Sequence, residues 1–171
     1  MKRTRKEYSQ FVDLIYEHQG ILHRVCSVYE SAPEDREDLY QEILLQSWRS
    51  FASFNGQSKF STWLYRVALN SALSRRRKTA GKWEIASLSA TSTEIAVQEP
   101  PDSDADAQLL HQCIRELSKL NRAIVLLYLE QHTYEEMAEI TGLTRANISV
   151  RLVRIKDQLR QLLLAKGYQE G

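Results

Sequence analysis

Cysteine, histidine, proline and glycine are all scarce in this chain of 171 residues, with two, four, three and six occurrences. Cys26 and Cys113 have no second cysteine or histidine at metal-ligand spacing, which favours two buried free thiols over a disulfide framework or a metal site. The histidines are scattered as well, at His18, His23, His111 and His132, and give no reason to expect zinc. The shortage of proline and glycine favours long helices, and no convincing strand pattern occurs.

Long apolar runs are also absent. The longest, residues 123–129, is far too short to cross a bilayer. The N-terminal residues MKRTRKEY are basic, but no apolar core follows them, so we expect no secretion signal. A reducing cytoplasm is therefore the expected compartment.

An excess of charge of one sign is missing overall, because the net charge is only +1. Residues 1–80 carry 13 Lys/Arg against 9 Asp/Glu, residues 81–108 carry one against six, and residues 109–171 carry nine against seven. Two mildly basic blocks therefore flank an acidic connector. The connector is also rich in Ser, Thr and Ala and contains Pro100-Pro101, a composition typical of a linker.

Residues 133–163 carry the clearest pattern in the chain. Thr133, with Glu136 three residues later, forms a capping box that predicts a helix start. Gly142 is suited to end that helix, because glycine tolerates the left-handed cap conformation, and Thr144 is suited to cap a second helix. The second helix is predicted by apolar residues at helical spacing, namely Ile148, Leu152, Ile155, Leu159 and Leu162. A short helix, a glycine-containing turn and a longer basic helix form a helix-turn-helix.

The polar side of the second of these helices suits DNA. Its polar residues are Arg145, Asn147, Ser149, Arg151, Arg154 and Lys156. Arginine and asparagine can bond base edges bidentately, whereas serine and lysine more often contact phosphates. A helical hairpin with a solvated basic face is the alternative, and DNA binding is the interpretation that we favour.

The rest of the chain is also predicted to be helical. Apolar periodicity predicts a first helix over residues 8–30, strongly acidic residues open a second at 34–38, and a third begins near Ser61. Periodicity fails from about Thr79 and resumes over residues 107–117 and after Ser118, an expected N-cap. The sequence thus predicts an all-α protein with two small helical domains, residues 1–80 and 107–171, joined by an acidic linker, residues 81–106.

A run of four cations, Arg75, Arg76, Arg77 and Lys78, ends the third predicted helix. Cations complement the negative end of a helix dipole, which can account for part of the run. Four in a row exceed that need, so we predict phosphate contacts.

Three blocks of this sequence resemble the extracytoplasmic-function (ECF) sigma factors, the compact group of bacterial RNA polymerase sigma subunits. DREDLYQE at residues 35–42, followed by Trp48-Arg49, resembles the polymerase-binding helix of sigma domain two. FSTWLYRVALN at residues 60–70 resembles the promoter-melting helix, and YEEMAEI at residues 134–140, with the helix after it, resembles sigma domain four. The blocks lie in the family's order and spacing and cover nearly the whole chain outside the linker.

The resemblance implies two sets of contacts for the N-terminal half. The acidic helix would dock on the clamp helices of the polymerase's largest subunit through Asp35, Asp38, Gln41 and Glu42, with Leu45 and Trp48 in either the interface or the core. A base flipped from the opened minus-ten element would be held by Phe54, Asn55, Ser58, Lys59 and Asn70. Phe54 is either the aromatic wall of that pocket or plain core, and the basic run would contact the backbone beside it.

For the C-terminal half, the resemblance implies recognition of the minus-thirty-five element. Ser149, Val150, Val153 and Arg154 match the family's groove-facing positions, flanked by Arg145, Asn147, Arg151 and Lys156. Many family members have glycine where this chain has Ala146, a basic residue where it has Ser149, and proline where it has Ser118. The promoter sequence therefore cannot be borrowed from relatives.

The leading hypothesis is a promoter-specificity subunit that is no enzyme and needs no cofactor or metal. Its partners would be promoter DNA and core RNA polymerase, through the clamp helices and the flap, and it would be a monomer when free. Many relatives are held inactive by an anti-sigma factor, which makes such a protein a candidate partner.

Two alternatives remain open. A helix-turn-helix regulator that binds duplex DNA as a dimer would explain residues 133–163, but it would leave the other two blocks unused. An enzyme would need paired carboxylates such as Glu135 with Glu136 or Asp35 with Asp38. Their places in the first turns of helices suit capping and dipole roles better, and no nucleophile accompanies them.

Overall fold

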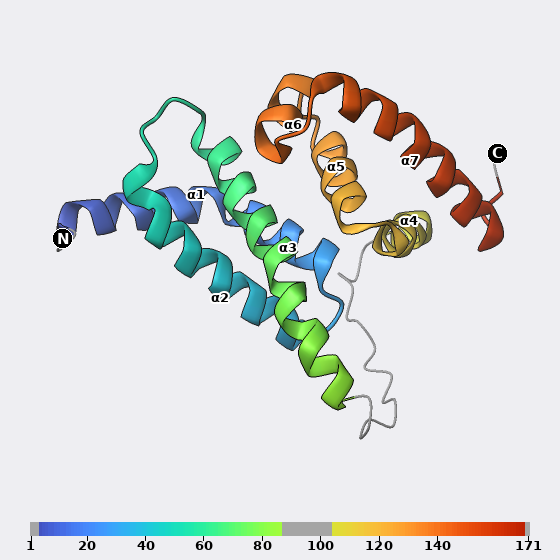
Figure 1. The fold of residues 1–171 in the computed structure, drawn as a ribbon, viewed down its shortest axis with the longest axis horizontal. Coiled ribbons are helices and arrows are strands. Elements are labelled where there is room, and N and C mark those ends of the chain that lie inside the picture. The colour runs from blue at the N-terminus through green and yellow to red at the C-terminus, as the bar shows by residue number, and fades with distance from the viewer. Residues whose placement is uncertain (1–3, 87–103, 170–171) are drawn as a thin grey trace. The chain divides into compact units, whose positions relative to one another are not determined.

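The computed structural model describes residues 4–86 and 104–169, with side chains described for 4–75 and 104–169. Over these residues the protein is all-helical, and no strand occurs in them (Figure 1). The chain divides into two compact units, Met1–Thr93 and Glu94–Gly171. The all-α prediction is therefore confirmed, while most of the predicted linker lies outside the described residues.

The N-terminal unit is a bundle of α1 (Arg5–Tyr29), α2 (Pro33–Ser50) and α3 (Phe60–Ala86), with the short helix η1 (Phe51–Ser53) after α2. Each of the three long helices packs against the other two. Their inward faces bury apolar side chains that include Leu22, Val25, Leu39, Ile43 and Leu64. Burial of such side chains is the main term that stabilises the unit.

Two helices differ most from the predicted bounds. Helix α1 begins one turn earlier than predicted, because Thr4 and Glu7 form a capping box: each backbone N–H donates to the other side chain. Helix α3 runs on to Ala86, beyond Thr79, where its apolar periodicity ends. Periodicity reports only the packed face, and no proline occurs between these two residues to stop the helix.

The C-terminal unit contains α4 (Ala105–Glu116), α5 (Lys119–Leu129), α6 (Tyr134–Thr141) and α7 (Arg145–Ala165). Each helix begins at a side chain that accepts a backbone N–H, namely that of Asp104, Ser118, Thr133 and Thr144. Gly142 ends α6 with a φ of 76°, the left-handed conformation that glycine adopts without strain. The predicted helix-turn-helix and its caps are confirmed.

The core of the C-terminal unit is formed by the N-terminal part of the predicted apolar stripe of α7 and residues from the other helices, whereas Leu159 and Leu162 of that stripe are only half-buried. Ile148, Leu152 and Ile155 of α7 are buried, together with Met137 of α6 and Ile124 of α5. Both cysteines are buried free thiols, as the sequence predicts. In the described part of the chain, none of the helices is long and apolar enough to span a membrane.

Candidate nucleic-acid and protein interfaces

The acidic residues of α2 lie along its exposed side. Asp38, Gln41 and Leu45 follow one another at helical i, i+3 and i+7 spacing and are exposed, and the side chain of Asp38 is 73% accessible. Glu42, on the flank of this ridge, is half-buried. Leu45 is 48% exposed, which places it on the surface and not in the core.

Trp48, by contrast, packs between α1 and α2. Its ring centroid lies 5.6 Å from that of Tyr8 and 5.1 Å from that of Phe11. Trp48 therefore joins two helices of the bundle, α1 and α2.

An apolar groove beside the acidic ridge was not predicted from the sequence. It runs between α1 and α2 and is lined by side chains that include Tyr8, Val12, Tyr16, Leu44, Leu45 and Trp48. Tyr16 is 73% exposed, and Val12 is exposed too. Val12 and Tyr16 are apolar or aromatic residues that lie off the buried face of α1, which carries Phe11, Ile15 and Leu22. Their place off this face is the signal that would have revealed the groove.

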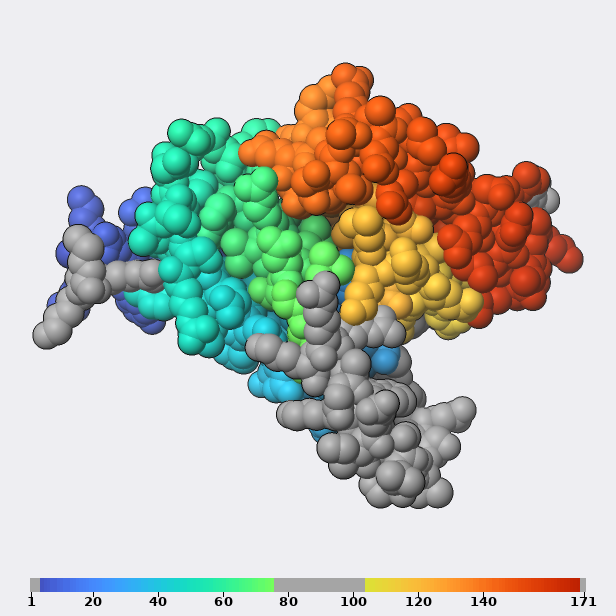
Figure 2. All heavy atoms as spheres, viewed as in Figure 1, coloured from blue at the N-terminus to red at the C-terminus, as the bar shows by residue number. Residues whose placement is uncertain are grey.

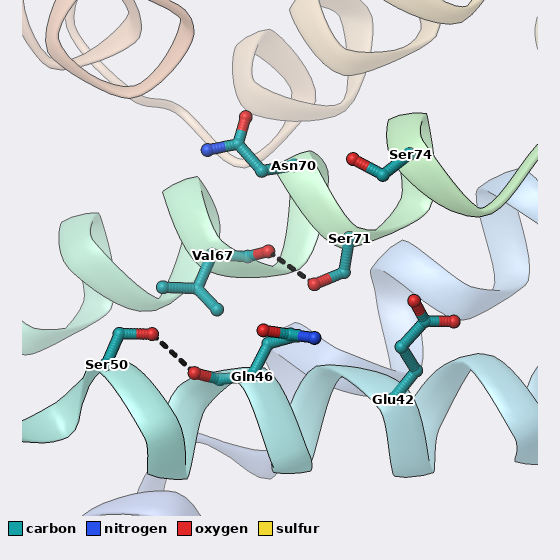
Figure 3. Close-up of a pocket in the computed structure, with 7 residues that line it drawn as sticks. All are labelled: Glu42, Gln46, Ser50, Val67, Asn70, Ser71 and Ser74. Carbon is teal, nitrogen blue, oxygen red and sulfur yellow. Dashed lines mark hydrogen bonds between the residues drawn. The ribbon is translucent and has the colours of Figure 1, made fainter. Parts of the chain in front are cut away.

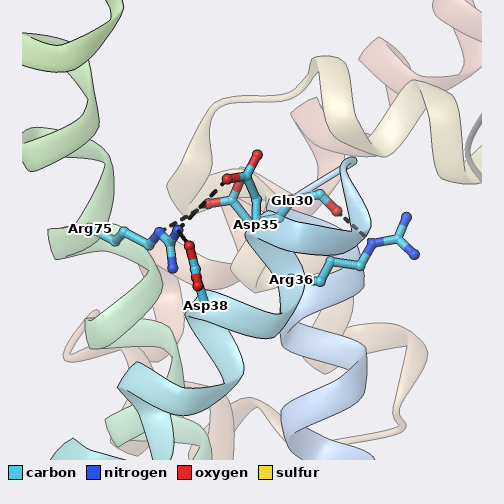
Figure 4. A network of polar contacts seen from close by, with 5 residues as sticks. All are labelled: Glu30, Asp35, Arg36, Asp38 and Arg75. Carbon is cyan, nitrogen blue, oxygen red and sulfur yellow. Dashed lines mark hydrogen bonds and ion pairs between the residues drawn. The ribbon is translucent and has the colours of Figure 1, made fainter. Parts of the chain in front are cut away.

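Arg75 turns back into the N-terminal unit. Its guanidinium lies 3.8 Å from a carboxylate oxygen of Glu30, 3.9 Å from one of Asp35 and 3.5 Å from one of Asp38 (Figure 4). The side chain of Arg75 is only 11% exposed. Arg75 belongs to the basic run that is predicted to contact phosphates. In the structure it pairs with Asp35 and Asp38, two of the predicted polymerase-binding residues. Arg76, Arg77 and Lys78 lie on α3, and their side chains are outside the described part of the chain.

The turn after α2 is ordered by its own side chains. Asn55 accepts a hydrogen bond from the backbone N–H of Gln57 at 3.2 Å, and Gly56 adopts a φ of 74°. Phe54 is half-buried, with its ring centroid 5.5 Å from that of Phe60 and 5.3 Å from that of Trp63. The Phe54 ring therefore packs against aromatic neighbours, which position it at the base of this turn.

A polar hollow of about 310 Å³ lies between α2 and α3, and Asn70 is one of its lining residues (Figure 3). The other lining residues are Glu42, Gln46, Ser50, Val67, Ser71 and Ser74. Ser71 donates to the backbone carbonyl of Val67 at 2.9 Å, and Ser50 donates to that of Gln46. Asn70 and Glu42 thus line the same hollow, whereas the predicted base-binding residues of the turn do not line it.

Helix α7 presents a second apolar surface opposite its buried stripe. Val150 is 53% and Val153 69% exposed, and Ser149 and Arg154 are exposed beside them. The space-filling view shows α7, in orange to red, at the surface of its unit (Figure 2). The four predicted groove-facing residues are therefore all accessible.

Arg145 and Arg151 are held in place by polar neighbours. Arg145 lies 2.6 Å from a carboxylate oxygen of Glu135 on α6. Arg151 donates to the side-chain oxygen of Asn147 at 2.8 Å and to that of Asn121 on α5 at 3.4 Å. Asn121, which lies 30 positions away in sequence, was not predicted as part of this surface.

Lys156 is held by Tyr128 of α5. Its ammonium donates to the Tyr128 hydroxyl at 3.0 Å and lies 4.4 Å from the centroid of that ring. This hydrogen bond raises the pKa of Lys156, so the residue stays cationic. Tyr128 is a second residue of this surface that sequence reasoning missed.

The carboxylate pairs that an enzyme would need have other roles in the structure. Glu136 accepts from the backbone N–H of Thr133 at 3.0 Å, and Glu135 pairs with Arg145. Burial raises the pKa of the Cys26 thiol to about 12, which removes it as a nucleophile. Over residues 4–75 and 104–169, the side chains form no group of three or more metal ligands.

Comparison with known proteins agrees with this two-part arrangement. A family model described as Sigma-70 region 2 matches residues 14–82, and one described as Sigma-70, region 4 matches residues 107–159. The chain is 24% identical to the ECF RNA polymerase sigma factor SigW of Bacillus subtilis, over 95% of this chain and 94% of that protein. It is 27% identical to the ECF RNA polymerase sigma-E factor of Haemophilus influenzae, over 85% and 83% of the two chains.

Solved structures share the fold. The sigma factor RpoE in complex with the anti-sigma factor NepR from Bartonella quintana superposes with a TM-score of 0.72 at 22% identity, covering 94% of this chain and 98% of that one. CnrH in complex with the cytosolic domain of CnrY gives 0.63 at 20% identity, covering 91% and 88%.

Proposed function

The chain belongs to the extracytoplasmic-function (ECF) family of RNA polymerase sigma factors, and we propose how its surfaces divide the work of promoter recognition. As a sigma factor it binds core polymerase, confers promoter recognition and assists DNA opening. Residues 1–80 bind polymerase and the minus-ten element, residues 107–171 bind the minus-thirty-five element, and residues 81–106 join them. The single observation that carries the proposal is the exposed surface of α7 opposite its buried stripe. The chain that presents this surface matches Sigma-70 region 2 and then Sigma-70 region 4 along its sequence.

The exposed ridge of α2 is the polymerase-binding surface. Asp35, Asp38, Gln41 and Glu42 supply charge and hydrogen bonds toward the clamp helices of the largest subunit. Exposed acids steer association and fix register more than they add affinity. Leu45 supplies the apolar contact, because a buried leucine at the centre of an interface gains about 1.5–3 kcal/mol.

The turn at residues 54–59, together with Asn70, holds a base flipped out of the minus-ten element. Extraction of a base costs a few kcal/mol, which stacking and hydrogen bonds must offset. Asn55 uses its side-chain oxygen within the turn, which leaves its amide donors for the base, and Phe54 offers a ring edge or face for stacking. Ser58, Lys59 and the basic residues Arg76, Arg77 and Lys78 contact the backbone.

The outer surface of α7 reads the minus-thirty-five element. Arg154 can bond a guanine bidentately, and Ser149 can donate or accept at a base edge. Val150 and Val153 cannot form hydrogen bonds, so their base-edge partner is the C5 methyl group of thymine. Arg145, Asn147, Arg151 and Lys156 flank these residues, and their intramolecular partners hold them at a fixed reach from the phosphates.

Further partners follow from the family. The flap of the polymerase binds the C-terminal unit, and an anti-sigma factor holds the protein inactive, which is supported by a structural neighbour solved in complex with the anti-sigma factor NepR. The free protein is a cytoplasmic monomer, acts without catalytic chemistry of its own and binds no cofactor.

Run-off transcription with core polymerase on genomic DNA, followed by promoter mapping, tests the proposal. We expect start sites that depend on the protein and that share two spaced elements. A protein that binds duplex DNA as a dimer and does not bind core polymerase would reject it in favour of a conventional regulator.

A further inference from the structure

We propose that Arg75 is a positioning residue of the polymerase-binding surface and takes no part in the DNA contact of the basic run. The proposal rests on the proposed role of α2 in binding polymerase. It separates Arg75 from the three cations that follow it in the sequence.

The geometry places Arg75 at the point where three carboxylates converge. Glu30 caps the end of α1, and Asp35 and Asp38 lie one turn apart at the start of α2 (Figure 4). Arg75 reaches all three from α3 at 3.5–3.9 Å, through Nε to Glu30 and through Nη2 to the two aspartates. One cation thereby ties together the three helices of the unit.

The start of α2 needs such a tie. Its N-cap, Ala32, has no side chain that can accept a backbone N–H, so the helix lacks the usual cap. Arg36 fixes the preceding loop by donating to the backbone carbonyl of Glu30 at 2.9 Å and of Ser31 at 3.1 Å. Without Arg75, the three nearby carboxylates would repel one another and spread apart.

The arrangement leaves the aspartates available to a partner. Arg75 contacts Asp35 through Oδ1 and Asp38 through Oδ2, and both side chains are more than half exposed. The outer oxygen of each can therefore accept from a polymerase cation while Arg75 holds the inner one. A surface fixed in advance loses less side-chain entropy when it binds, which strengthens binding.

The same geometry argues against a phosphate contact by Arg75. Its side chain is 11% exposed, whereas that of Asp38 is 73% exposed. To reach DNA, Arg75 would have to leave three carboxylates without their cation. Its neighbour Arg76 belongs to the same run and provides a control at the adjacent position.

The test compares Arg75→Ala with Arg76→Ala in the full chain, by measuring the Kd for core polymerase and the salt dependence of promoter binding by the holoenzyme. Arg75→Ala should weaken polymerase binding by about fivefold. It should leave unchanged the salt slope, which is the slope of the logarithm of promoter affinity against the logarithm of salt concentration. Arg76→Ala should leave polymerase binding unchanged and reduce the salt slope by about one. Arg75→Lys should restore part of the polymerase affinity, because it keeps the charge.

A double-mutant cycle excludes a general loss of structure as the cause. In an Asp38→Asn background, Arg75→Ala should cost less than in the wild type, because one of its partners is already neutral. Glu30→Gln changes a residue that lies off the proposed contact surface, and it should weaken polymerase binding about twofold. This variant provides the test if Arg75→Ala does not fold. A reduced salt slope with unchanged polymerase Kd in Arg75→Ala would overturn the proposal. Failure of the wild type to bind polymerase would instead reject the proposed function.

Discussion

The two units hold their charged residues in different ways. In the N-terminal unit, Arg75 pairs with carboxylates from two other helices and faces inward. In the C-terminal unit, the side chains of Val150, Val153 and Arg154 face outward from α7, and their direction is set by the burial of the opposite stripe. The proposed polymerase-binding surface depends on a contact between helices, whereas the proposed DNA-binding surface depends mainly on the register of one helix.

The largest effect should come from the cations that remain in the basic run. We expect the triple change Arg76→Ala, Arg77→Ala and Lys78→Ala to reduce the salt slope of promoter binding by about two to three, with a large loss of affinity at low salt. Polymerase binding should be unaffected, as measured by the Kd of the free protein for core enzyme. An unchanged slope would show that the run does not contact phosphates and would remove this contrast with Arg75.

Arg154→Ala should have the next largest effect. Loss of a bidentate base contact costs about 1–3 kcal/mol, which is roughly five- to 150-fold in selection of the upstream element. Competition between promoters with intact and scrambled upstream elements measures this selection. Arg160→Ala, further along α7, is the matched control and should retain it. Equal losses of element selection and polymerase affinity would contradict the division of labour between the units.

The valines provide a finer test of the C-terminal surface. Replacement of thymine by deoxyuridine in the mapped upstream element removes single methyl groups, and we expect about fourfold weaker binding at each contacted position. Val153→Ala should abolish that difference at one position, whereas Leu164→Ala, another exposed apolar change on α7, should not. Equal affinity for thymine and deoxyuridine throughout the element would exclude methyl readout.

The smallest effect should follow from Tyr128→Phe. The change keeps the ring beneath the Lys156 ammonium but removes the hydroxyl that accepts a hydrogen bond from it. Since the pair is exposed, we expect about a twofold loss of upstream-element affinity. Filter binding at fixed salt measures it, with Tyr16→Phe in the other unit as the control. A loss as large as that of Arg154→Ala would mean that the hydroxyl itself contacts DNA.

The sequence predicted those parts of the structure that depend on neighbouring residues. The capping box of Thr133 and Glu136, the left-handed Gly142 and the cap at Thr144 all act within four positions, so their spacing determines them. The buried stripe of α7 followed from helical periodicity for the same reason. Because the register of α7 was correct, its exposed side was correct as well.

Contacts between distant residues could not be predicted in this way. Arg75 stands in a run of cations, and nothing in that run shows that the side chain pairs with residues 30, 35 and 38. Tyr128 and Lys156 are 28 positions apart, and their pairing depends on how α5 packs against α7. The sequence suggests candidate residues for each surface, but it does not show which distant residues, such as Asn121 and Tyr128, packing adds to them.

Each unit contains one cysteine whose sulfur is sealed from solvent, Cys26 in the first and Cys113 in the second. Because burial raises the pKa of both thiols, a thiol-specific dye can modify either of them only when its unit opens. The modification rate of each cysteine therefore reports how often its own unit opens. Labelling rates of single-cysteine variants would measure those openings separately, with and without polymerase, and no cysteine would have to be introduced.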